Sequence, residues 1–197
     1  MKLKIFLPFG AMILSASLFS CHNQGTEKST ENTVVAASGA LQAPYSDIYY
    51  DSLHQVMGAY YQLSAAFAGS NATAASAAAE VLKLHIDSLP VQLLQMDSSR
   101  LGNVTGITGS ISAELTGLQG EQDIEGKRAS FQMISDMLYD LIKATGYKGH
   151  TVYHQFCPMA FDDKGAYWLS ETQKIINPYF GEKMLECGST NDSLIYK

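Results

Sequence analysis

The chain has 197 residues, of which 46% are hydrophobic and 16% charged, and its formal net charge at pH 7 is -6. This acidic balance, without a basic tract after the N-terminal segment, excludes a nucleic-acid-binding protein, because such proteins need clustered Lys and Arg to release counterions from phosphates. A chain of this length predicts one folded domain with a sizeable core.

The first 20 residues have the plan of a secretory signal peptide. They carry two lysines, no acidic residue and an apolar run over residues 5–19, which is short for crossing a bilayer. The run ends in Leu18-Phe19-Ser20-Cys21, which resembles a bacterial lipobox. The resemblance implies cleavage before Cys21 and lipidation of Cys21. We therefore expect a lipid-anchored protein of the bacterial cell envelope, exposed to the periplasm or the cell surface, whose membrane contact is this lipid.

Residues 21–45 are polar, small and without periodicity, which predicts a flexible tether. From Tyr49 the pattern changes, because apolar residues recur at helical spacing up to Gly69. Asn71 is a candidate N-cap for a second, alanine-rich helix with an inward stripe that includes Val81 and His85, and Pro90 interrupts this helix.

Two more helices complete the predicted bundle. Residues 103–119 keep an apolar stripe despite several glycines that lower helix propensity, and a stronger pattern extends from Ile124 to Thr145, with Gly146 as a candidate C-cap. Four amphipathic helices with short links predict an antiparallel four-helix bundle over about residues 47–146. We therefore expect an all-α fold, in a single helical domain over residues 46–197.

Residues 147–190 form a tail of different composition. The tail holds the two cysteines other than Cys21, the single tryptophan and prolines 158 and 178. Because prolines and glycines interrupt any helical period, the tail predicts an irregular segment packed on the bundle through its aromatic residues.

The tail also carries the residues with recognisable chemistry, which are His154, Cys157, Met159, Met184 and Cys187. Thiolates and thioethers are soft donors that favour Cu(I) or a related ion such as Ag(I), and imidazole is compatible with them. The joint spacing of these five residues predicts a soft-metal site.

A disulfide between Cys157 and Cys187 is the competing prediction. An exported chain meets an oxidising compartment, where thiols either pair or hold metal. A bridge closing this loop of about 31 residues would stabilise the fold by about 3 to 4 kcal/mol. Metal binding needs the thiolates free, so the two predictions exclude each other, and the sequence leaves both open.

A family resemblance rests on the segments Cys157-Pro158-Met159-Ala160, Gly165-Ala166-Tyr167-Trp168-Leu169-Ser170, Asn177-Pro178-Tyr179-Phe180-Gly181 and Met184-Leu185-Glu186-Cys187-Gly188. They closely resemble the end of domain of unknown function 3347, and with the helices before them the resemblance covers about residues 48–190. That family occurs in bacterial lipoproteins and as an extension of periplasmic adaptor subunits in heavy-metal efflux pumps. The resemblance implies a helical domain outside the cytoplasm, in a context of copper and related metals.

A looser similarity is to the short heavy-metal-binding modules of efflux adaptors. Tyr153, Cys157, Pro158 and Met159 match the order of that module, but Ala160 stands where the module has a second histidine. This departure puts a direct transfer of its ligand set in doubt. The chain is also too short to be a pump adaptor itself.

The sequence lacks the common catalytic motifs, such as His-Glu-x-x-His, Gly-x-Ser-x-Gly, a phosphate-binding loop and Cys-x-x-Cys. We therefore expect a protein without enzymatic activity. The first expected function is capture of Cu(I) or a related soft ion, for heavy-metal tolerance or for transfer to a periplasmic efflux system. The alternative is a structural or protein-interaction module with a Cys157–Cys187 disulfide.

Overall fold

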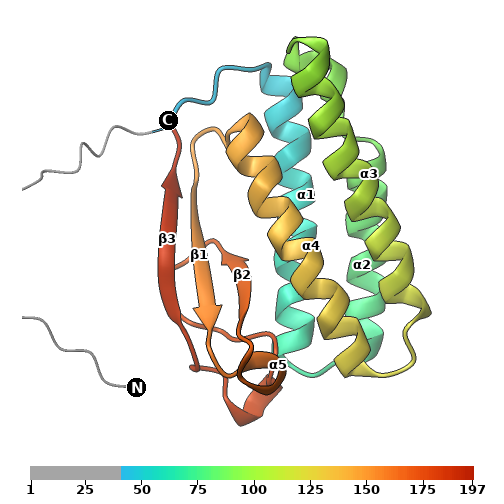
Figure 1. The fold of residues 1–197 in the computed structure, drawn as a ribbon, viewed down its shortest axis with the longest axis vertical. Helices are drawn as coiled ribbons and strands as arrows, with labels where there is room; N and C mark the ends of the chain where they lie inside the picture. The colour runs from blue at the N-terminus through green and yellow to red at the C-terminus, as the bar shows by residue number, and fades with distance from the viewer. Residues whose placement is uncertain (1–40) are drawn as a thin grey trace, which may run out of the picture. The chain divides into compact units, whose positions relative to one another are not determined.

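The computed structural model describes residues 41–197. The predicted signal peptide, the lipidation site Cys21 and most of the predicted tether lie outside the described residues. Four long helices make up the larger part of the described chain, and a small sheet lies beside them (Figure 1). Within this part, none of the helices is both long and apolar enough to cross a bilayer.

Side chains cap the N-termini of three of the four long helices. The four helices are α1 (Asp47–Ala68), α2 (Ala72–Asp87), α3 (Ser98–Gly120) and α4 (Ile124–Thr145), with a 3-10 turn η1 (Val91–Leu94) before α3. Asn71 accepts a hydrogen bond from Ala74 N at 2.9 Å, so the predicted N-cap of α2 is confirmed. Asp97 and Asp123 cap α3 and α4 in the same way. Gly146 follows α4 with φ +81°, which confirms the predicted C-cap.

The helices run alternately up and down, and their aromatic residues fill the centre. The rings of Tyr60 on α1 and Phe131 on α4 stack with centroids 5.3 Å apart, and Phe67 packs against Phe131 at 5.1 Å. On α2 the inward face is rotated from the predicted stripe, because Ile86 is buried whereas Val81 is 41% exposed. The predicted mainly helical domain is confirmed.

The tail is a sheet with a covering loop, so the prediction of an all-α fold with an irregular tail was wrong for this segment. The strands β1 (Thr151–Cys157), β2 (Ala166–Ser170) and β3 (Ser189–Ile195) form an antiparallel sheet in the order β2-β1-β3. The sheet lies beside the bundle, with β2 packed near α4 (Figure 1). The strands were missed because the central strand is buried on both faces, which removes the polar alternation that identifies a strand in sequence.

Residues 171–188, which we name the covering segment, connect β2 to β3 and include the short turn η2 (Gly181–Lys183). The buried Asn177 holds this segment closed, because its Nδ2 donates to Cys187 O at 2.7 Å and its Oδ1 accepts from Tyr179 N at 2.7 Å. Gln155 on β1 also donates through Nε2 to Thr172 O at 3.0 Å. These bonds place Cys187 over the end of β1.

Candidate functional site

The two cysteines of the tail meet at the end of β1. Cys157 is its last residue and is fully buried, whereas Cys187, in the covering segment, is partly exposed. Their Sγ atoms lie 2.7 Å apart, and both residues are free thiols in the structure. The hydrogen bond that the Cys187 thiol shares with Cys157, followed by burial, raises the pKa of Cys187 to about 11. The Cys187 thiol is therefore protonated at neutral pH.

His154 does not join the cysteines. Because side chains alternate along a strand, residues three positions apart on β1 point to opposite faces of the sheet. The imidazole of His154 is stacked between Tyr139 on α4, at 3.9 Å between centroids, and Tyr167 on β2, at 4.4 Å. Burial lowers the pKa of His154, although Asp192 acts in the opposite direction. The structure gives this residue a packing role.

The two methionines lie between the two cysteines in sequence. Met159 follows the end of β1 and is 47% exposed, on the wall of a pocket. Met184 follows η2 and is partly buried, and its carbonyl accepts a hydrogen bond from Cys187 N at 3.2 Å. In residues 41–197, no three His, Cys, Asp or Glu side chains lie together as a metal ion requires. Of the five predicted ligands, the structure shows the two thiols in contact.

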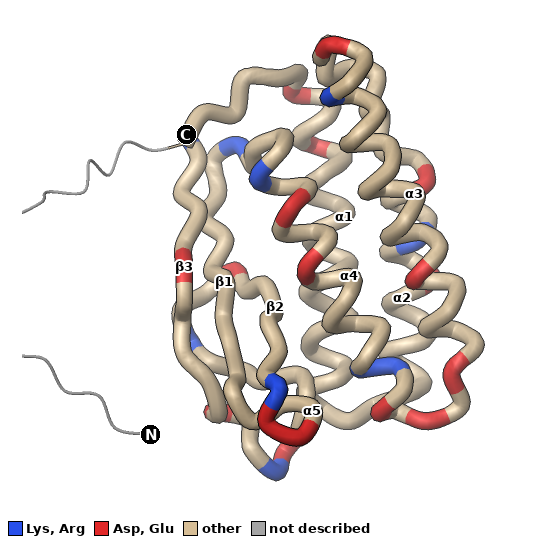
Figure 2. Tube along the Cα trace, in the orientation of Figure 1, with Lys and Arg blue, Asp and Glu red and all other residues tan. Residues whose placement is uncertain are grey.

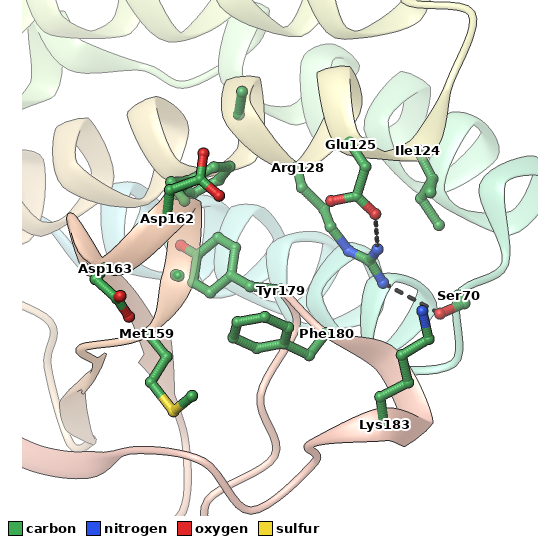
Figure 3. A pocket seen from close by; sticks show the side chains of 13 residues that line it. Ser70, Ile124, Glu125, Arg128, Met159, Asp162, Asp163, Tyr179, Phe180 and Lys183 are labelled. Carbon is green, nitrogen blue, oxygen red and sulfur yellow. Dashed lines mark hydrogen bonds and ion pairs between the residues drawn. The ribbon is translucent and has the colours of Figure 1, made fainter.

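A pocket of about 730 Å³ lies beside Met159 (Figure 3). Its walls come from the start of α4, from the turn before β2 and from the covering segment. Apolar side chains alternate with charged ones around it; the lining residues are Ser70, Ile124, Glu125, Arg128, Ala129, Met159, Ala160, Phe161, Asp162, Asp163, Tyr179, Phe180 and Lys183. Its volume is within the range of ligand-binding cavities, and its mixed lining is compatible with binding an apolar group beside a charged one.

One wall of the pocket is a left-handed turn, α5 (Ala160–Asp163). Three consecutive residues, Phe161, Asp162 and Asp163, have φ angles of 53°, 57° and 61°. Such angles are unfavourable for residues with a side chain and persist only where the surrounding structure imposes them. Gly165 closes the turn with φ +79°, and acidic and basic positions follow one another along the chain at α5 (Figure 2). The Asp-Asp-Lys-Gly sequence is therefore a turn.

Arg128 on α4 is the pocket residue with the most extensive contacts. Its side chain is almost fully buried, with 3% of the residue surface exposed. Nε donates to Pro178 O at 2.9 Å, and Nη2 donates to Phe67 O at 2.9 Å and to Ser70 Oγ at 3.1 Å. Nη1 forms an ion pair with Glu125 at 2.6 Å (Figure 3). Arg128 thereby joins the end of α1, the start of α4 and the covering segment.

Sequence reasoning missed Arg128, Phe161 and Phe180 as pocket residues. Arg128 lies near the start of an amphipathic helix, where an arginine is usually a solvated surface residue. Its burial follows from the position of the covering segment, which no local pattern indicates. A polar residue on the inward face of the predicted helix is the one signal that could have identified it.

One family model matches the helical part of the chain. Residues 56–150 match the family model described as "Protein of unknown function (DUF3347)". The match extends from α1 to the residue before β1, so the predicted resemblance is confirmed for the helices, and the thiol pair lies beyond the matched residues. Searches of the curated proteins and of the solved structures found no significant match.

Proposed function

We propose that this chain is a non-enzymatic, lipid-anchored protein of the bacterial cell envelope, and that its folded domain is an interaction module closed by a bond between Cys157 and Cys187. The observation that supports the bond is the 2.7 Å distance between the two Sγ atoms. A small rotation of the side chains brings such sulfurs to the length of a disulfide, about 2.05 Å. An oxidising compartment outside the cytoplasm favours that product.

The bond would give the pocket a fixed shape. Cys157 ends the central strand, and Cys187 belongs to the same covering segment that supplies Phe180 and Lys183 to the pocket. Linking the two cysteines holds this wall against the strand. The exposed part of Met159 and the rings of Phe161 and Phe180 then form a preorganised apolar surface among charged groups, which is the composition of a binding site.

Crosslinking tests whether this pocket is the contact surface. A photoreactive amino acid placed at Met159 in the full chain, in intact cells, should crosslink to a discrete partner. The matched position is Leu84 on α2, which is 64% exposed and does not line the pocket. Crosslinks that form equally from both positions, or that persist when Cys157 and Cys187 are both changed to Ser, would count against the proposal.

Capture of a soft metal ion by the same thiol pair is the second candidate function. It is supported by two adjacent thiols, one of them partly exposed, because two thiolates are donors that favour Cu(I) over hard ions. The donor set that fits is Cys157 and Cys187, with Met159 and Met184 near them in sequence. This ion would serve heavy-metal tolerance or transfer to a periplasmic efflux system.

A Cu(I) titration separates the two candidates. The reduced full chain is titrated with Cu(I) against a competing chelator, beside a variant in which both Cys157 and Cys187 are Ser and a His85→Gln control. Metal capture predicts one equivalent bound by the wild-type chain and the control, and none by the cysteine variant. Equal binding by all three chains would reject a site at the thiol pair.

Lipid attachment at Cys21 is tested separately. Cells fed with a labelled fatty acid should incorporate the label into the wild-type chain, and the Cys21→Ala variant should remain unlabelled. Label in the variant, or no label in the wild-type chain, would contradict the anchor.

A further inference from the structure

A pair of histidines lies outside the site described above. His54 is on α1, and His150 is in the connection between α4 and β1. Their ring centroids are 4.3 Å apart, with an angle of 67° between the ring planes. They are 96 positions apart in the chain, so it is the folded domain that brings the two imidazoles together.

The ring of His54 is fixed by a neighbouring carbonyl. Its Nε2 lies 3.2 Å from the carbonyl oxygen of Lys148. Because a carbonyl oxygen only accepts, Nε2 carries the proton, and Nδ1 of the neutral ring is left with a free lone pair. An imidazole that donates one N–H to a backbone carbonyl and presents its other nitrogen is the arrangement of a metal-binding histidine.

The two rings form part of the wall of a small pocket of about 240 Å³. Its lining residues are His54, Gly58, Tyr61, Tyr147, His150, Thr151 and Glu171. The hydroxyl of Tyr61 is sealed from solvent without a hydrogen-bond partner in the structure. A buried hydroxyl without a partner costs free energy, so the protein's own groups do not satisfy every polar atom of Tyr61. Glu171 supplies a carboxylate at the same pocket.

We propose that His54 and His150 bind one divalent transition ion of the zinc type, with the carboxylate of Glu171 as the third ligand. Two imidazoles and a carboxylate are a donor set that suits Zn²⁺ and does not favour Cu(I), which prefers sulfur. Since no three such side chains converge among the described residues, the exposed Glu171 must rotate toward the rings when the ion binds. A ligand on a surface loop can make this movement without disturbing the helices.

This site is independent of the cysteine pair. The pocket that contains His54 and His150 has no lining residue in common with the pocket beside Met159. The donor classes also differ, because one site offers nitrogen and oxygen and the other offers sulfur. Loss of one site therefore leaves the other intact, and the two proposals fail or succeed separately.

The test is a Zn²⁺ titration of the full chain by calorimetry, with no other metal present. We expect one equivalent to bind to the wild-type chain, to His85→Gln and to a chain in which both Cys157 and Cys187 are Ser. His54→Gln and His150→Gln should each weaken binding by at least about tenfold, and Glu171→Gln should weaken it less. Unchanged affinity in both histidine variants, or loss of binding in the cysteine variant, would overturn the proposal.

Two further measurements distinguish loss of the metal site from misfolding of a variant. His150→Gln changes a residue in a connection, so its metal-free melting temperature should match that of the wild-type chain. In the wild-type chain, Zn²⁺ should also shift the imidazole proton resonances of His54 and His150 and leave those of His85 in place. Absence of these shifts at saturating Zn²⁺ would overturn the proposal even if a variant does not fold.

Discussion

Cys157 and Cys187 are thirty positions apart in the chain, and their Sγ atoms lie 2.7 Å apart in the fold. The first ends the central strand, and the second is held by Asn177 in the covering segment. This contact links the sheet to the segment that walls the pocket. The stability of the tail and the shape of the pocket should therefore depend on the redox state of one pair of thiols.

The first prediction concerns the stability gained from the bond. The oxidised wild-type chain should be more stable than a Cys187→Ser variant by about 3 to 4 kcal/mol, because the bond restricts a loop of about 31 residues in the unfolded state. Urea unfolding with and without reductant measures this difference. Reductant should destabilise the wild-type chain and leave the variant unchanged; equal stability of the oxidised and reduced wild-type chain would contradict the prediction.

Arg128 should be far more important for stability than an exposed arginine. Arg128→Ala removes the guanidinium donor from the buried carbonyls of Phe67 and Pro178, of which Phe67 O keeps the bond from Ser70 N, and we expect a loss of roughly 2 to 4 kcal/mol in the free energy of unfolding. The matched control is Arg100→Ala on α3, whose guanidinium donates to Tyr45 Oη at 3.2 Å at the surface. That change should cost about 0.5 kcal/mol or less. Similar losses in the two variants would show that the Arg128 contacts are unimportant.

Replacement by alanine should change the stability of the chain in opposite directions at two glycines. Gly188 has φ +139°, and an added Cβ would lie 2.8 Å from both Phe156 O and the Trp168 ring. Gly188→Ala should destabilise the chain by about 2 kcal/mol or more. Gly109 on α3 faces open space, so Gly109→Ala should stabilise it by about 0.5 to 1 kcal/mol. Thermal unfolding of both variants checks the signs of the two stability changes. A Gly188→Ala variant that is more stable than the wild-type chain would contradict the close packing described for Gly188.

His154 should make the fold sensitive to acid. Burial lowers its pKa in the folded state below the ordinary value of 6.5, so the unfolded chain binds the proton more readily. The stability that this difference contributes is present above about pH 6.5 and is lost as the pH falls below that value. His154→Phe keeps an aromatic ring between Tyr139 and Tyr167. In this variant, the part of the acid-induced loss of stability that comes from protonation of His154 should disappear.

Urea unfolding at pH 7.5 and at pH 5.5 measures the effect for the wild-type chain, for His154→Phe and for a His85→Gln control. The control should keep the wild-type pH dependence. A His154→Phe chain that loses as much stability between the two pH values as the wild-type chain would rule out a buried, neutral His154.

The helices could be predicted because their signals are local. Asn71 and Gly146 mark helix ends by their own side-chain and backbone chemistry, and the apolar spacing of α4 identifies its buried face. Even α3, with its several glycines, forms the expected helix, because packing of Ile111 and Leu115 in the core outweighs a weak propensity.

The sheet and the pocket depend on contacts between distant segments, which local patterns do not encode. β1 pairs with β3 across more than thirty residues, and its burial on both faces hides the alternation of a strand. The thiol pair could be predicted, because in a chain expected to be exported two cysteines have few other partners. The separation of His154 from Cys157 could not be predicted, since it follows from the strand that holds both residues.

The state of the two thiols tests the central proposal most directly. The full chain is isolated from the cell envelope without reductant, free thiols are blocked at once, and the digested protein is analysed by mass spectrometry. The proposal predicts one linked pair of peptides, containing Cys157 and Cys187, which separates on reduction. Two blocked, unlinked thiols in the protein from the envelope would contradict the proposed bond.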